Sequence, residues 1–286
     1  MNKNPDISII IPLYNAGKFI QNAINSIYAQ ENHAFSFEII IIDDKSTDNS
    51  KDIVEKMQYN EIILIELQQN SGTARARNEG LKNATGTWIL FLDSDDKLGA
   101  SLFHQFELCL QPDINVYLFS LISEYKDCLL NQTIIKVIDK RSFGHFGTAC
   151  NKFIRREICL KFNVQYSFED VVFIVDMMNK PELKIALIKD AFYMYNRKNN
   201  YSKMANFNKA EYLRMYDYIL SQIEISDRLT RMFILETFVG ILFSKNMPFQ
   251  LSAGIALKTF FRLYKYLPEV YLNGIRNNVR STINNC

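Results

Sequence analysis

A short apolar segment that ends abruptly in a cluster of acids constrains this chain more than any other feature. Trp88–Leu92 is apolar throughout, and three aspartates, Asp93, Asp95 and Asp96, follow it around a single serine. An apolar run of this length predicts a buried strand, and open α/β sheets bind ligands just beyond the carboxyl ends of their strands. Carboxylates this close together repel one another unless a cation shares them. The segment therefore predicts a site for Mg²⁺ or Mn²⁺, and the alternative is a solvated acidic turn that caps the next helix.

The segments before this strand alternate between strand and helix patterns. Apolar, β-branched runs predict strands at 7–14, 37–42 and 62–67, and apolar residues at three- and four-residue spacing predict helices at 19–28 and about 47–58. Ser46 is placed to cap the second of these helices. Strands that are apolar along their whole length and alternate with helices are typical of a parallel sheet covered on both faces. We therefore expect an α/β fold with a mostly parallel, doubly wound sheet.

A basic helix is predicted after the turn at Asn70–Gly72. It carries Arg75 and Arg77 in its opening turns and ends near Gly86. Cations near a helix N-terminus are unfavourable for the helix dipole, so these two residues need another explanation. An anionic ligand nearby would provide one, and a solvated basic face is the alternative.

The pattern is less regular beyond the acidic cluster. Further predicted elements are a helix at 100–110, a strand at 114–121, edge strands and a loop at 122–147, a helix that starts at Glu169 and Asp170, and two short strands at 185–188 and 191–195. Acids at a helix start commonly do no more than complement the dipole, so Glu169 and Asp170 alone indicate no activity.

From about Asn206 the strand patterns cease. Helices are predicted at 210–225, 228–243 and 251–266, and the stretch from Arg228 to Arg280 holds eight basic and two acidic residues, interleaved with Phe260, Phe261, Tyr264 and Tyr266. Basic helices with aromatic residues fit an anionic membrane surface. The alternatives are contact with a partner helix or a second copy of the chain, and core packing with a solvated back face. We therefore expect an α/β domain at 1–205 and a helical appendage at 206–286.

Composition excludes several other classes of protein. The five cysteines are scattered without a C-x-x-C pair, which argues against a disulfide framework and structural zinc, and the three histidines lack the spacing of metal ligands. A net charge of +2 indicates no nucleic-acid partner. No apolar run approaches the roughly 18 to 20 residues that span a bilayer, and residues 1–6 lack the apolar core of a signal peptide. We therefore expect a cytoplasmic protein.

Five motifs, taken in order, resemble the signature of the family 2 glycosyltransferases of GT-A fold. They are Pro12–Asn15 (PLYN), Asp43–Asp48 (DDKSTD), Asn70–Gly72 (NSG) with Ala76–Gly80 (ARNEG), Leu92–Asp96 (LDSDD), and Phe168–Asp170 (FED) with Phe173. The match spans roughly residues 7–200 and implies a Rossmann-like, mostly parallel sheet. The predicted C-terminal helices lie outside it.

The resemblance implies a site for a nucleotide-diphosphate sugar. Asp44 would accept an N–H of uracil, and the residues that would line the nucleotide-sugar site with it are Pro12, Tyr14, Asn15, Asn70 and Ser94. Arg77 would stand near the base or the phosphates. Asp93 would reach the ribose or the metal shell, and Asp95 would bind the Mn²⁺ or Mg²⁺ that bridges the diphosphate.

The resemblance also implies a mechanism. Asp170 would be the general base that takes the proton from the acceptor hydroxyl as it attacks the anomeric carbon, and Glu169 would orient the acceptor or tune the base. A single displacement inverts the anomeric centre. Processive members carry a Q-x-x-R-W motif after the base, which this chain lacks, so we expect transfer of one sugar. Tyr193, Tyr195 and Arg197 stand where related enzymes place an aromatic strand near the site.

The expected activity is therefore an inverting, metal-dependent transfer from a UDP-hexose or UDP-N-acetylhexosamine to a glycan hydroxyl. The expected acceptor belongs to lipopolysaccharide, capsule or another surface polysaccharide and is lipid-linked, on the inner face of the plasma membrane. An aspartyl-phosphate phosphatase would instead place its acid pair after the first strand. A non-catalytic nucleotide-sugar-binding subunit would have no need of Asp170.

Overall fold

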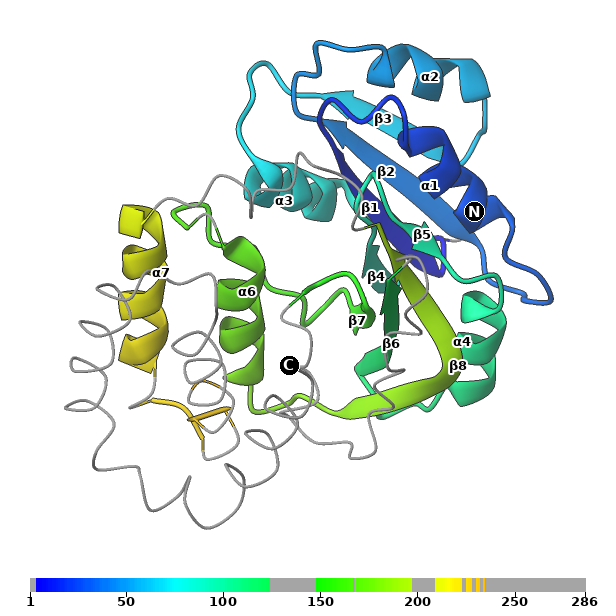
Figure 1. Cartoon of the computed structure of the whole chain (residues 1–286). Helices are drawn as coiled ribbons and strands as arrows, with labels where there is room; N and C mark the ends of the chain where they lie inside the picture. Colours follow the sequence, from blue (N-terminus) through cyan, green and yellow to red (C-terminus); the bar gives the residue numbers. More distant parts are fainter. Residues whose placement is uncertain are drawn as a thin grey trace. The chain divides into compact units, whose positions relative to one another are not determined.

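The computed structural model describes residues 4–123, 148–166, 168–196 and 209–222, and beyond them residues 225–227, 230, 231 and 234. The chain divides into two compact units, Met1–Tyr212 and Leu213–Cys286. The first holds the sheet and most of the helices drawn in Figure 1. The edge strands and loop expected at 122–147 lie outside the described residues except for residues 122 and 123, which belong to a strand that starts at Val116. The helices expected at 228–243 and 251–266 lie entirely or almost entirely outside the described residues, and the boundary after residue 205 stays a prediction.

A mixed sheet forms the centre of the first unit. Within the described residues it has eight strands in the order β3-β2-β1-β4-β7-β6-β8-β5. The strands are β1 (Ile7–Leu13), β2 (Phe37–Asp43), β3 (Ile62–Glu66), β4 (Trp88–Phe91), β5 (Lys97–Leu98), β6 (Val116–Ser123), β7 (Lys152–Arg155) and β8 (Ile185–Tyr195). The first four are parallel, whereas β7 runs antiparallel to both β4 and β6, and β5 antiparallel to β8. The expected α/β class is confirmed, but β5 and β7 were not predicted.

The parallel strands form because they are apolar on both faces. Every residue of β1 is buried except Pro12, which is half-buried, and β1 lies between β2 and β4. Pro12 lies beyond the stretch Ile7–Ile10 that pairs with β4, where its missing N–H does not interrupt that ladder. On one face α3 packs against β1 and β2. A Cβ at Gly80 of α3 would lie 2.4 Å from Ile10 Cγ2, so this glycine allows the close approach.

The described helices agree with the expected ones except at their ends. They are α1 (Ile20–Tyr28), α2 (Ser50–Met57), α3 (Thr73–Asn83), α4 (Leu102–Cys109), α6 (Glu169–Met178) and α7 (Lys209–Gln222). Helix α2 starts at Ser50, so the predicted cap at Ser46 is wrong. The Ser46 hydroxyl instead accepts the N–H of Asn15, and the Ser50 N–H donates to Asp48. The bond between Asn15 and Ser46 joins the loops that follow β1 and β2.

The two short strands expected at 185–188 and 191–195 are one strand, β8. Asp190 interrupts its regular backbone with a left-handed φ of 55°. The pairing with β6 shifts register between Leu118 and Ser120. The polar pair Lys189 and Asp190 produced the apparent break in the sequence pattern, and the irregularity is absorbed within a continuous strand.

Candidate active site

The carboxyl ends of three neighbouring parallel strands carry most of the predicted site residues. Tyr14 and Asn15 follow β1, Asp44 follows β2, and Asp93 is the second residue after β4. Because β2, β1 and β4 are adjacent and parallel, these side chains lie along one edge of the sheet.

Asp44 fixes the loop that leads into α3. Its two carboxylate oxygens accept the N–H groups of Ser71 (2.6 Å) and Gly72 (2.7 Å), and the side chain is buried. Gly72 has a φ of 87°, a conformation that favours glycine. A carboxylate has about four acceptor sites, so these two bonds leave part of the acceptor capacity of Asp44 unused.

The other predicted nucleotide-sugar residues are in mixed environments. Tyr14 is 48% exposed and Asn70 is also exposed, whereas Pro12 and Ser94 are half-buried. Asn15 has a left-handed backbone, and its side-chain oxygen accepts the N–H groups of Thr47 and Asp48. Tyr14 and Asn70 are thus open to a ligand, and Asn15 organises the loop beside them.

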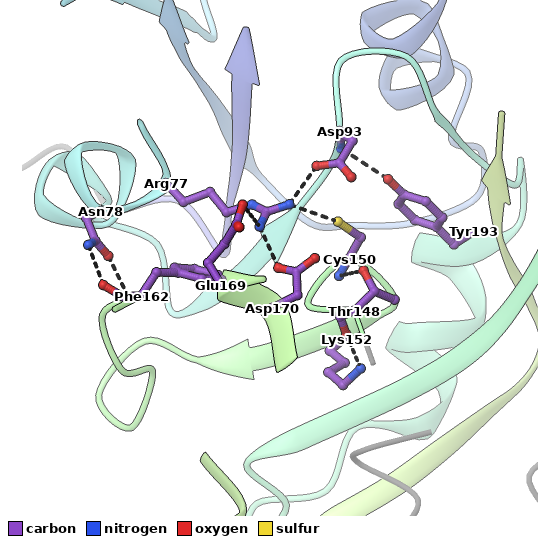
Figure 2. Close-up of polar contacts among 10 residues, drawn as sticks. All are labelled: Arg77, Asn78, Asp93, Thr148, Cys150, Lys152, Phe162, Glu169, Asp170 and Tyr193. Atoms are coloured by element: carbon purple, nitrogen blue, oxygen red, sulfur yellow. Dashed lines mark hydrogen bonds and ion pairs between the residues drawn. The ribbon is translucent and has the colours of Figure 1, made fainter. Parts of the chain in front are cut away.

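Arg77 lies at the centre of the polar network in Figure 2. Its Nη1 donates to Asp170 Oδ1 at 2.5 Å and lies 3.8 Å from Glu169 Oε1, and its Nη2 donates to Asp93 Oδ1 at 2.8 Å. The side chain is only 2% exposed, and its guanidinium carbon lies 5.1 Å from the centre of the Phe162 ring. The structure therefore places Arg77 between Asp93, which follows β4, and the acids at the start of α6, whereas Arg75 is exposed.

A side-chain amide brings these distant parts of the chain together. Asn78, next to Arg77 on α3, accepts the N–H of Phe162 at 2.7 Å and donates to its carbonyl at 2.8 Å. Phe162 in turn stacks on Phe173 of α6 with the ring centres 4.3 Å apart. The segment that precedes α6 is thereby attached to α3, which places Asp170 beside Arg77.

Asp170 is in an environment that suits a general base. The pKa of this carboxyl is raised to about 6: removal of water by the surrounding protein raises it most, Arg77 opposes that effect, and the charges of Glu169 and Asp93 add to it. The side chain keeps 27% of its surface exposed. Asp170 is therefore ionised at neutral pH, is more basic than an ordinary aspartate, and remains accessible to a proton donor.

A buried lysine and a buried cysteine also belong to this network, and the sequence reasoning missed both. Lys152 of β7 is fully buried, and its Nζ donates to the carbonyl of Thr148 (2.5 Å) and to Asn151 Oδ1 (2.6 Å). Burial lowers the pKa of Lys152 to about 7. Cys150 Sγ lies 3.9 Å from Arg77 Nη2, and burial raises the pKa of its thiol. No residue pattern in 148–155 distinguishes these side chains from ordinary strand residues.

Asp96 differs from the two aspartates before it. It is buried, its Oδ2 accepts the hydroxyl of Tyr193 at 2.7 Å, and its Oδ1 accepts the N–H of Asn196 at 2.7 Å. The Tyr193 oxygen also accepts the N–H of Asp93 at 3.1 Å. Burial, with the charges of Asp93 and Asp95, raises the pKa of Asp96 to about 8. Asp96 therefore joins the acidic loop to the end of β8.

The acidic loop fits a divalent ion that shares its ligands with a substrate. Among the described residues no group of three or more His, Cys, Asp or Glu side chains is arranged to hold a metal by itself. The repulsion that Asp93 and Asp95 exert on Asp96 nevertheless indicates surplus negative charge. Mg²⁺ is commonly held by one or two carboxylates together with phosphate oxygens and water. Asp93 and Asp95 would supply the two carboxylates of such a set.

Comparison with known proteins gives a consistent family. Residues 8–106 match the family model described as Glycosyl transferase family 2. The chain is 44% identical over 97 residues to the poly(ribitol-phosphate) beta-glucosyltransferase of Bacillus spizizenii, which is 33% of this chain and 15% of that protein. It is 41% identical over 98 residues to the putative teichuronic acid biosynthesis glycosyltransferase TuaG of Bacillus subtilis, which is 34% of this chain and 38% of that protein. The matches thus span well under half the length of these relatives.

The fold has a counterpart among solved structures. The crystal structure of S. aureus TarS 1-349 in complex with UDP-GlcNAc superposes with a TM-score of 0.73 at 22% sequence identity, and the match covers 86% of this chain and 75% of that one. The expected GT-A fold is confirmed by this likeness.

Proposed function

Residues 8–106 of the chain match the model of glycosyltransferase family 2, and on that premise we propose that the protein is an inverting, metal-dependent glycosyltransferase. It transfers one sugar from a UDP-hexose or UDP-N-acetylhexosamine to a hydroxyl of a surface glycan. The observation that carries this proposal is that Asp93, at the strand end where donors bind, and Asp170, a basic and accessible carboxylate, contact the same guanidinium. A donor-side acid and a general base are thereby held close together.

The environment of Asp44 supports the proposed donor class, and the names of the relatives support the proposed acceptor class. Asp44, at the end of β2, retains acceptor sites that pair with the imide N–H of uracil, whereas guanine would be excluded mainly by its size. The relatives are named for glucosyl transfer to poly(ribitol-phosphate) and for teichuronic acid synthesis, and both of these are polymers. A surface polymer such as teichoic acid, capsule or lipopolysaccharide is therefore the proposed acceptor, in a lipid-linked form.

The residues of the chain account for the chemistry of a single displacement. The acceptor oxygen forms a bond to the anomeric carbon, the bond from that carbon to the diphosphate oxygen breaks on the opposite face, and Asp170 takes the hydroxyl proton. The configuration of the anomeric carbon is therefore inverted. Glu169 is buried beside Arg77, so it is less suited than Asp170 to receive the proton. A divalent ion at Asp93 and Asp95, when bound, offsets the charge that develops on the leaving diphosphate.

The test is a screen of nucleotide sugars with release of free nucleotide as the readout. We expect release from a UDP-sugar in the presence of Mn²⁺ or Mg²⁺ and none in excess chelator, and tighter calorimetric binding of UDP than of GDP. Full activity in chelator would contradict the metal requirement, and tighter binding of GDP would contradict the uridine donor. Binding of a UDP-sugar without release or transfer across a panel of acceptors would favour the non-catalytic binding subunit instead.

A further inference from the structure

We propose that Arg77 is a positioning residue for the transfer reaction, which holds Asp170 against the donor-side acid Asp93, and that it does not read the nucleotide. This inference rests on the proposed function. It differs from the role in donor binding that the family resemblance implies for this arginine.

Both ends of the guanidinium are engaged within the protein. Nη1 donates to Asp170 on α6, and Nη2 donates to Asp93 after β4 and lies against Cys150 before β7 (Figure 2). The Phe162 ring lies beside the group, and the side chain is almost fully buried. Little of its surface remains for a base or a phosphate, whereas three separate segments of the chain meet at it.

The charges around Arg77 make it necessary for the geometry of the acids. Asp93, Glu169 and Asp170 all lie within 4 Å of its Nη atoms. Carboxylates packed in this way repel one another strongly where water is scarce, so without a cation Asp170 would turn away or take up a proton. Arg77 lowers the pKa of Asp170 and opposes the effects of Glu169 and Asp93 on it.

The shape of the side chain matters as well as its charge. A guanidinium is planar and offers its donors in a rigid fork, so two acceptors bound at Nη1 and Nη2 are held at a fixed separation. A lysine has a single ammonium on a flexible stem and cannot bridge two carboxylates in that way. Replacement of Arg77 by lysine thus retains the charge and removes the bridge.

The first experiment compares Arg77→Lys with wild type in donor binding and in turnover. We expect kcat to fall on the order of 10²-fold, the lower end of the range for loss of general-base catalysis. The Kd for UDP, measured by calorimetry, and the donor KM should stay within about threefold of wild type. Arg155→Lys is the matched control, because Arg155 also lies over an aromatic ring, Trp88, but its side-chain bonds within the described residues go to the backbone carbonyls of Ile114 and Pro112. It should leave kcat unchanged.

A second experiment asks whether Arg77 acts through Asp170. In an Asp170→Asn background, Arg77→Lys should cause no further loss of kcat, because the group that it positions is already inactive. Asp170→Asn removes one of the three carboxylates that Arg77 separates, so the double variant has less charge repulsion than Arg77→Lys alone. If Arg77→Lys does not fold, UDP binding is measured on the double variant instead.

The outcomes separate the possible roles. Tenfold weaker UDP binding with kcat retained would overturn the inference and make Arg77 a nucleotide contact. Losses of kcat that multiply in the double variant would also overturn it, since they indicate general structural damage. Absence of transfer by the wild-type protein with every donor would instead reject the proposed function.

Discussion

The three aspartates that follow β4 divide between two environments, although they lie within four residues of one another. Asp93 and Asp95 keep part of their surface exposed, whereas Asp96 is buried and bonded to Tyr193 and Asn196. A carboxylate that already accepts two internal hydrogen bonds is less available to an ion than one at the surface. At the scale of single residues, the acid cluster therefore combines two ligand candidates with one structural acid.

The first prediction concerns Asp95. Asp95→Ala should abolish metal-dependent turnover and weaken Mn²⁺ binding measured by calorimetry, while the thermal unfolding midpoint stays close to that of wild type. The fold should survive because the substitution relieves repulsion among neighbouring carboxylates. Asp113→Ala, at an exposed acid on another part of the surface, is the control. Unchanged Mn²⁺ affinity in Asp95→Ala would show that this residue is not a ligand.

The second prediction concerns the base. Asp170→Asn should retain UDP binding and lose on the order of 10² to 10⁴ in kcat, whereas Glu169→Gln should be the milder change. Because the pKa of Asp170 is raised to about 6, the base is ionised above that pH and becomes protonated as the pH falls through it. In the wild-type protein kcat/KM should therefore be level near pH 7 and decline below about pH 6. A profile that stays level down to pH 4, or a greater loss in Glu169→Gln, would contradict the assignment.

At the scale of elements, the end of strand β8 is hydrogen-bonded to the acidic loop, residues 93–96. The Tyr193 hydroxyl donates to Asp96 and accepts from the backbone of Asp93, and Asn196 bonds the same Asp96 carboxylate. Two residues of the loop, Asp93 and Asp96, are therefore bonded to the end of β8, and each partner is 100 residues further along the chain. The position of the exposed acids depends on these contacts.

The third prediction tests this support with Tyr193→Phe. Loss of one hydroxyl removes two hydrogen bonds of the loop, so the variant should be destabilised by about 1–3 kcal/mol and should bind Mn²⁺ several-fold more weakly. The matched control is Tyr117→Phe, because the buried Tyr117 hydroxyl also accepts a backbone N–H, that of Gln111, away from the acidic loop. It should lose stability without losing Mn²⁺ affinity. Equal Mn²⁺ affinity in the two variants would count against a supporting role for β8.

The elements that could be predicted from the sequence are those whose signal is local. Strands β1, β2 and β4 are mostly apolar, with Ser8 in β1 and Glu38 in β2 as interior exceptions, and this pattern predicted parallel strands whose ends share one edge. That Asp44 and Asp93 belong to one site was implied by the family resemblance. Strand β7 forms through its pairing with β4 and β6, which are distant in sequence. It contains the charged residue Lys152, so it lacks the apolar pattern that predicts a buried strand.

The central contact of the site could not be predicted in the same way. Arg77 and Asp170 are 93 residues apart, and the bonds of Asn78 to Phe162 attach the segment before α6 to α3. An asparagine on a helix face has no distinctive pattern, because its partners are backbone atoms of a distant segment. The family resemblance identified both charged residues but not that they touch.

At the scale of the whole molecule, the chain has a second unit, Leu213–Cys286, in addition to the one that carries the site. In the part of the chain that the structure describes, no helix is both long enough and apolar enough to cross a membrane. The excess of basic residues in 228–280 is a property of the sequence. Eight basic residues against two acidic ones, with interleaved aromatics, fit an anionic lipid surface, where the proposed lipid-linked acceptor would lie.

The last prediction is that this basic segment holds the enzyme on the cytoplasmic face of the membrane. Lys258, Arg262 and Lys265 follow one another at intervals of four and three, which places them on one face of the helix expected at 251–266. Each contributes about 1 kcal/mol near an anionic leaflet, so changing all three to glutamine should weaken sedimentation with anionic vesicles on the order of 10²-fold. The same change at Lys56, Lys82 and Lys184, which are exposed in the first unit, alters the net charge equally and should have little effect. Equal partitioning of the wild-type protein to neutral and anionic vesicles would instead favour core packing or contact with a second copy of the chain.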